Sequence, residues 1–208
     1  RDLIKGNFNN WGAEARFLSS YSIGGKTATW LIGAKYYNAF KVKNLMLQAE
    51  YNQVRPYTYS HNTIVLNYAH NNQPMAHLWG ANFRELVLIG RYQKQRWFGE
   101  VKVITGVRGF DYNNQTDNFS YGGDIYRDYN DRPFDTGVEI GQGIKTTSIN
   151  ASAQLGYLVN PASNLKAFVN VNYRNFNPEA ETLNVYNNST VWFNFGLRTD
   201  LFNWYFDY

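Results

Sequence analysis

The sequence lacks cysteine, a long apolar run and a block of basic residues. Each absence reduces the number of protein classes to which the chain could belong. The missing cysteines are compatible with a cell-envelope protein and remove one kind of zinc ligand. The mean hydropathy of −0.51 and the lack of an apolar run of about 18 residues exclude a helical membrane protein. The net charge of +4 is dispersed, so nothing indicates nucleic-acid binding. No linker or low-complexity segment divides residues 1–208, which predicts one domain.

Aromatic residues are abundant, with 17 Tyr, 14 Phe and 6 Trp making up 18% of the chain. Such a content suits a transmembrane β-barrel, in which aromatic girdles lie at both membrane interfaces. An aromatic-rich glycan-binding β-domain is the alternative. The chain begins at Arg1 without a methionine or a signal peptide, so we expect a mature product or a piece of a longer protein.

Alternation of apolar and polar residues is clearest between Lys145 and Asn175. Two alternating stretches flank the turn-forming residues 160–163. Because strand side chains point alternately to opposite faces, this pattern predicts a hairpin with one apolar face and one polar face. The apolar face is predicted to include Ile149, Ala151, Leu155, Val169 and Val171, and the polar face Asn150, Gln154, Asn170 and Asn172. Transmembrane β-barrels repeat this unit, and soluble β-sandwiches contain it too.

The rest of the chain repeats the pattern. Further strands are predicted near residues 11–21, 28–36, 45–52, 82–92, 101–108 and 190–208, although 82–92 lacks a clean period. Breaks near 38–44, 93–96 and 160–163 are short, whereas those near 60–80, 113–143 and 176–189 are long. Outer-membrane barrels sort their loops in this way, and Gly24-Gly25 is the one short exception. The predicted fold is an all-β, antiparallel transmembrane β-barrel with about eight strands in this chain.

The chain ends FNWYFDY, which resembles the recognition signal of outer-membrane barrels for their assembly machinery. We allow for a bulge near residues 199–202, where the apolar positions change parity. The segments EYNQVRPYTYSH (50–61), NYAHNNQPMAHLWGANFRE (67–85) and GLRTDLFNWYFDY (196–208) resemble Bacteroidota outer-membrane proteins grouped with the capsule-assembly Wzi family, which include a gliding-motility barrel.

The resemblance implies a larger barrel, of which this chain is the carboxy-terminal part, in the outer membrane of a Gram-negative bacterium. Its relatives in capsulated enterobacteria act as surface lectins that hold capsular polysaccharide. Related barrels in Bacteroidota accompany gliding motility and type IX secretion. The partners that it implies are outer-membrane lipid, surface polysaccharide and other envelope proteins.

A polar segment between residues 59 and 82 is the first candidate site. Its side chains predict a plug or lid across a barrel mouth, whose Asn, Gln and His satisfy the backbone, or a glycan contact. The histidine spacing matches no familiar pair of zinc ligands, and no activated nucleophile is recognisable. The candidate residues are His61, Asn67, Tyr68, His70, Asn71, Asn72, Gln73 and His77.

A second polar segment, residues 121–143, is rich in aspartate. The spacing departs from that of an EF-hand loop. Either calcium stabilises this loop, or Arg127 and Arg132 neutralise its acids. The calcium candidates are Asp124, Asp128, Asp131 and Asp135.

Charged residues of both signs are predicted on the polar face, which favours a cross-linked interior over a selective pore. We therefore expect a non-enzymatic barrel without a cofactor that binds surface polysaccharide or joins an envelope complex. A general porin or solute channel is the alternative. The charged residues expected inside are Glu14, Arg16, Lys35, Glu50, Glu100, Lys102, Arg108, Lys166, Arg174 and Arg198.

Overall fold

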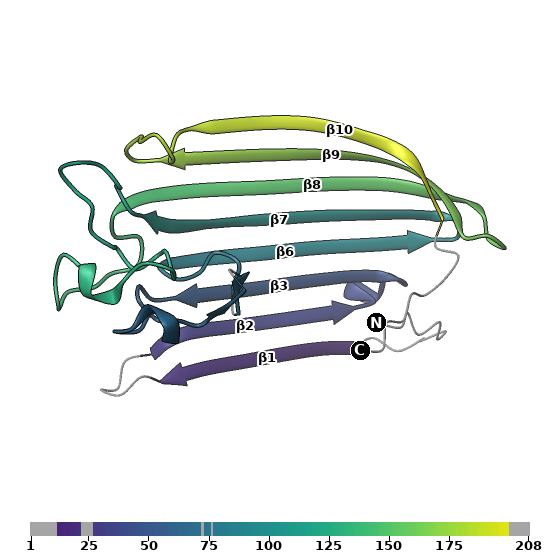
Figure 1. Ribbon diagram of the computed structural model, residues 1–208. Coiled ribbons are helices and arrows are strands. Elements are labelled where there is room, and N and C mark those ends of the chain that lie inside the picture. The colour runs from purple at the N-terminus through teal and green to yellow at the C-terminus, as the bar shows by residue number, and fades with distance from the viewer. Residues whose placement is uncertain (1–11, 22–26, 72, 76, 200–208) are drawn as a thin grey trace.

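A computed structural model describes residues 12–21, 27–71, 73–75 and 77–199 (Figure 1). Within this part the chain forms an eight-stranded antiparallel sheet whose strands lie side by side in chain order. The strands are β1 (Gly12–Tyr21), β2 (Thr27–Tyr37), β3 (Leu45–Val54), β6 (Phe83–Lys94), β7 (Trp97–Phe110), β8 (Ile144–Asn160), β9 (Leu165–Pro178) and β10 (Asn188–Thr199). The prediction of an all-β antiparallel fold with eight long strands is confirmed.

Smaller elements decorate the connections. The strands β4 (Ala69–His70) and β5 (Gln73–Pro74) pair in a separate two-stranded hairpin. Three single turns of 3-10 helix lie at Ala39–Lys41, Ile64–Leu66 and Tyr129–Asp131. No helix in the described residues has the length and apolarity needed to cross a membrane.

The sheet is open in the part of the chain that the structure describes. There β1 pairs with β2 alone and β10 with β9 alone, at opposite edges of the sheet (Figure 1). Each edge strand therefore presents an unpaired row of backbone N–H and C=O groups along one side. The described residues by themselves do not close a barrel.

Strand register divides the side chains into an apolar face and a polar face. One row across the apolar face reads Ala34, Ala49, Leu88, Val103, Ala151, Tyr173 and Val191. On the opposite face the neighbouring row reads Glu50, Val87, Ile104, Asn150, Arg174 and Thr190. The predicted division of the hairpin 145–175 into two faces follows this register.

Strand β6 shows why residues 82–92 lack a clean period. Leu86 and Leu88 lie on the apolar face, and Val87 and Ile89 lie on the polar face beside Ile104. Apolar residues on both faces remove the two-residue alternation that a one-sided strand shows.

Connections of different length gather at opposite ends of the sheet (Figure 1). The short ones, residues 38–44, 95–96 and 161–164, lie at one end, and the long ones, residues 55–82, 111–143 and 179–187, lie at the other. This is the predicted sorting of the loops. The Gly24-Gly25 turn and the FNWYFDY ending, with the parity change expected near it, lie outside the described residues.

Buried apolar residues gather where the long loops meet the polar face. Val54, Ala81 and Phe83 form a buried cluster, against which Tyr59 and Trp79 pack. By contrast, the apolar face is open: Phe193 is 76% exposed and Phe195 87%. The hydrophobic core of the described molecule therefore lies between sheet and loops, at the end that carries the long connections.

Candidate functional site

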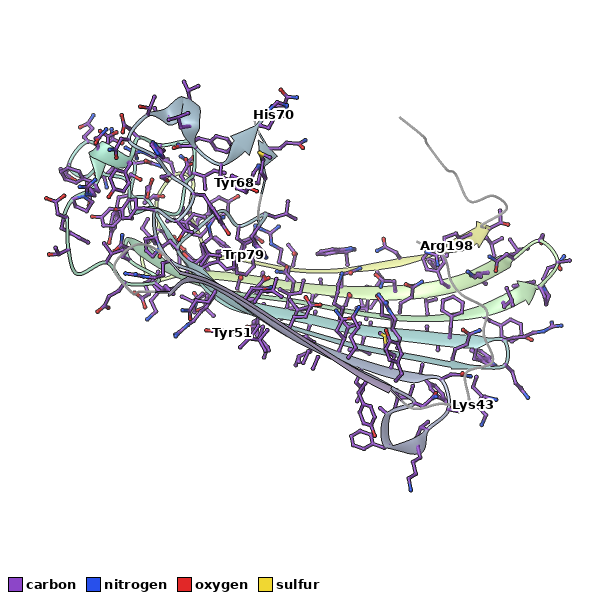
Figure 2. All side chains as sticks on the ribbon, turned by 90° about the horizontal axis from the view of Figure 1, so that it is seen from below. Lys43, Tyr51, Tyr68, His70, Trp79 and Arg198 are labelled. Atoms are coloured by element: carbon purple, nitrogen blue, oxygen red, sulfur yellow. The ribbon has the colours of Figure 1, made fainter. Side chains whose placement is uncertain are left out.

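Two long connections, residues 55–82 and 111–143, fold over one end of the polar face, and we call them the loop cluster. Figure 2 shows Tyr68, His70 and Trp79 on the same side of the sheet as Arg198, with Tyr51 on the opposite side. The loop cluster therefore covers one end of the polar face and leaves the apolar face bare.

Asn82 joins the two connections at the base of the loop cluster. It is fully buried, and its left-handed φ of 59° is a conformation that asparagine tolerates better than most residues. Its Nδ2 donates to the carbonyl oxygens of Tyr121 at 3.2 Å and Gln142 at 2.9 Å, and its Oδ1 accepts from the N–H of Gly141 at 2.6 Å. One side chain thus satisfies three backbone groups of the other connection.

Tyr57 makes a second junction. Its hydroxyl donates to the carbonyl of Ser120 at 2.6 Å, and its N–H donates to the carbonyl of Gly122 at 3.1 Å. Burial, together with the negative charge of Asp111, raises the pKa of the Tyr57 hydroxyl to about 12. The phenol therefore remains a hydrogen-bond donor at any physiological pH.

Asn67, one of the candidate residues of the segment 59–82, is buried against the second connection. Its Nδ2 donates to the carbonyl of Ile125 at 2.6 Å, and its Oδ1 accepts from the N–H of His61 at 2.5 Å. Such bonds are those expected of a loop that satisfies its own backbone. Tyr68 stacks on Tyr59 with ring centroids 5.8 Å apart and is half exposed.

The other predicted residues of this segment divide into two groups. His61, His70, Asn71 and Gln73 are exposed, and Asn72 lies outside the described residues. His77 turns inward: its Nε2 lies 2.7 Å from Oε1 of Glu85, and its Nδ1 accepts from the N–H of Trp79 at 3.1 Å. Because Nδ1 is an acceptor, Nε2 carries the proton in the neutral ring and donates to Glu85.

The structure does not bring the three histidines together. Among the described residues, no group of three or more His, Cys, Asp or Glu side chains could hold a metal ion. Glu85 instead receives hydrogen bonds from His77 and from Nδ2 of Asn52, the latter at 2.8 Å. The buried Glu85 and Asn52, together with the partly buried His77, attach the loop cluster to the sheet.

The four candidate aspartates are engaged within their own loop. Asp124 accepts a hydrogen bond from the N–H of Tyr126 at 2.9 Å, and Asp128 accepts one from the N–H of Asn130 at 2.8 Å. Arg132 lies 2.6 Å from Asp135. Figure 1 places the whole segment beyond the ends of β7 and β8.

Arg127 is the ionic centre of the second connection. It lies 3.9 Å from Asp131 and 3.4 Å from the buried Asp111, and it also donates to Asn113. Burial raises the pKa of Asp111, while the N–H of Tyr121 and the charge of Arg127 oppose that rise. The arginines thus pair with acids that the sequence offered as calcium ligands.

A pocket of about 260 Å³ opens on the polar face beside the loop cluster, and we call it the arginine pocket. Strands β7, β8 and β9 supply all but one of its residues, and the first connection supplies the last. It is lined by Trp79, Arg108, Phe110, Thr146, Ser148, Asn150, Arg174 and Phe176. The walls combine two guanidinium groups, three aromatic rings and small polar side chains.

The aromatic walls are ordered by mutual contacts. The guanidinium of Arg108 lies 4.5 Å from the centre of the Phe110 ring, and the Phe110 and Phe176 rings meet edge to face at 5.7 Å. Arg108 reaches the carbonyl of Gly123 in the loop cluster at 3.5 Å. Its Nε–H is buried without a hydrogen-bond partner among the described residues.

Sequence alternation located part of this pocket and missed the rest. Arg108, Asn150 and Arg174 were expected on the polar face by parity. Phe110 and Phe176 lie just beyond the predicted strand ends, and continuing the parity by two residues finds them. Trp79 belongs to a connection without any period, so no local signal marks it.

No family model matches the chain, and no curated protein or solved structure matches it either.

Proposed function

We propose that this chain forms part of the wall of a non-enzymatic outer-membrane β-barrel that binds surface polysaccharide. The observation that carries the proposal is the apolar face, which runs across the sheet and remains exposed from Ile32 to Leu197. Soluble proteins rarely expose apolar patches larger than a few hundred Å². Contact with lipid would remove the free-energy cost of exposing this face to water, because hydrocarbon is as apolar as the face itself.

The open edges support a larger barrel. A sheet edge within hydrocarbon leaves backbone groups without partners, at a cost of several kcal/mol for each group. The proposal therefore requires further strands that pair with β1 and β10. The family resemblance of residues 50–61 and 67–85, which implies a larger barrel, is consistent with such further strands in the same protein.

The loop cluster supports binding over permeation. It lies across the polar face at the end with the long connections (Figure 2) and is fixed there by Asn82, Tyr57 and Glu85. On the same face Arg91 pairs with Glu100, which fits the expected cross-linked interior. A lumen occupied in this way leaves little open cross-section for a general porin.

Polysaccharide is favoured as the ligand by the chemistry of the covered face. Asn, Ser, Thr and Arg side chains offer hydrogen bonds there, and aromatic rings lie among them. A second role for a non-enzymatic barrel is that of a subunit of a gliding-motility or type IX secretion complex, which the family resemblance favours.

Two measurements on the purified full-length protein test the proposal. Reconstituted into planar bilayers, it is expected to give no steady single-channel conductance, and a large stable conductance would favour the porin alternative. On a glycan array it is expected to retain polysaccharides. A protein that inserts into bilayers and binds no glycan would leave the barrel in place and favour the complex-subunit role.

A further inference from the structure

We infer that the arginine pocket binds one carboxylate-bearing sugar unit, such as a uronate residue, of an acidic polysaccharide. The inference rests on the proposed function and names its ligand class. Figure 2 shows that Trp79 and Arg198 face the same side of the sheet, the side on which the pocket opens.

Charge is the first argument. The pocket is lined by Arg108 and Arg174 and by no acidic residue. Asp111 and Asp124 are the acids close enough to act on Arg108, and Asp111 is already paired with Arg127. Arg174 is exposed and makes no ion pair within the described part of the chain. Two guanidinium groups therefore favour an anion, and their planar forks match a carboxylate.

Unused hydrogen-bonding groups are the second argument. Asn150 lies directly across the β8–β9 pair from Arg174, and Ser148 is the next lining residue along β8. An anion with neighbouring hydroxyl groups would engage these donors and acceptors together.

Shape and ring chemistry are the third argument. The pocket volume of about 260 Å³ falls below the roughly 300–1,000 Å³ of drug-sized sites, so it suits a single sugar ring. Trp79, Phe110 and Phe176 line the same space, and aromatic rings offer flat apolar surface to the C–H face of a sugar. A bare inorganic anion would leave that surface unused.

The test measures binding by calorimetry with the purified full-length protein in detergent. D-glucuronic acid is the probe, D-glucose is the neutral match, and inorganic phosphate and sulfate represent simple anions. We expect glucuronate to bind more tightly than the other three, with an affinity that falls as salt is added. Arg174→Gln should weaken glucuronate binding at least about tenfold, because a charge-assisted hydrogen bond is lost.

Matched variants distinguish specific recognition of glucuronate in the pocket from non-specific attraction by positive charge. Arg198→Gln removes another exposed arginine of the same face. This arginine lies away from the pocket, 5.8 Å from the centre of the Phe168 ring. The substitution should leave glucuronate binding unchanged. Arg174→Lys should retain part of the affinity, because it keeps the charge and loses the fork. Migration of unheated samples on a gel would show that each variant is folded.

Several results would overturn the inference. They are equal affinity for glucose and glucuronate, tighter binding of phosphate than of glucuronate, or equal effects of the Arg174 and Arg198 substitutions. A bilayer-embedded protein that binds no glucuronate would overturn the inference alone. Glucuronate binding through Arg174 by a protein that does not enter bilayers would support the inference and overturn the proposed membrane location.

Discussion

The N–H of Gly141 donates a 2.6 Å hydrogen bond to Oδ1 of Asn82, a residue 59 positions earlier in the chain. The same asparagine contacts Tyr121 and Gln142. Because the two long connections meet on one buried side chain, they form a single unit over the polar face. The loop cluster is therefore expected to detach from the sheet cooperatively when this junction fails.

Asn82→Ala should loosen the loop cluster while leaving the strands in place. The substitution removes three hydrogen bonds at a buried site, and each orphaned buried group costs about 1–3 kcal/mol. Limited proteolysis should cut residues 111–143 faster in the variant. The matched control is Asn71→Ala, which changes an exposed asparagine with a similar φ of 48°. Equal cleavage of the two variants would contradict the proposed role of Asn82.

Gly109→Ala should disturb the same junction from the strand side. A methyl group at Gly109 would collide with the carbonyl oxygen of Gln142 and with Nδ2 of Asn82, and such overpacking typically costs about 1–3 kcal/mol. Gly99→Ala is the control within β7, because its nearest neighbour would be the Gln154 carbonyl at an ordinary 3.5 Å. Hydrogen exchange of the loop cluster should increase in the first variant only, and an unchanged rate at Gly109→Ala would count against the close approach.

Ionisation of Tyr57 should weaken the attachment of the loop cluster at alkaline pH. Its pKa rises from an ordinary 10.0 to about 12, so the folded state holds the proton more tightly than the open state does. The stabilisation is complete below pH 10, and it is lost as the pH rises through about 12. Proteolytic release of the loops should increase across this window in the parent protein.

Tyr57→Phe is the control for that window. The variant should open more readily at neutral pH, because the hydrogen bond to Ser120 is gone. It should also lose the additional alkaline transition, since phenylalanine does not titrate. An identical alkaline transition in both proteins would assign the effect to other groups.

Val169→Arg tests the lipid-facing assignment of the apolar face. Val169 is 56% exposed on that face, and an arginine near the bilayer midplane costs on the order of 2–4 kcal/mol. Asn170→Arg is the neighbouring control, because its side chain lies on the polar face opposite Gln154. Denaturant unfolding of the full-length protein from lipid vesicles should show the loss for Val169→Arg, and the reverse order would invert the two faces.

Sequence alternation determined the eight strands, their two faces and the sorting of short and long connections. Side chains alternate on every strand, so one apolar face leaves a two-residue period that can be recognised locally, as in residues 145–175. The period fails where both faces carry apolar residues, as with Leu88 and Ile89 in β6. Alternation also placed Arg108, Asn150 and Arg174 on one face, but it did not show that they line one pocket.

Only the tertiary structure decided how the two long connections meet and what they enclose. Asn67, Asn82 and Tyr57 act across 58 to 63 residues of sequence, and irregular backbone has no period from which such contacts follow. The sequence selected the whole 59–82 segment as one site, and the structure divided it into anchors such as Asn67 and His77 and exposed residues such as His70. Hydrogen bonds between side chains and distant backbone groups become predictable only once the sheet has brought the strand ends together.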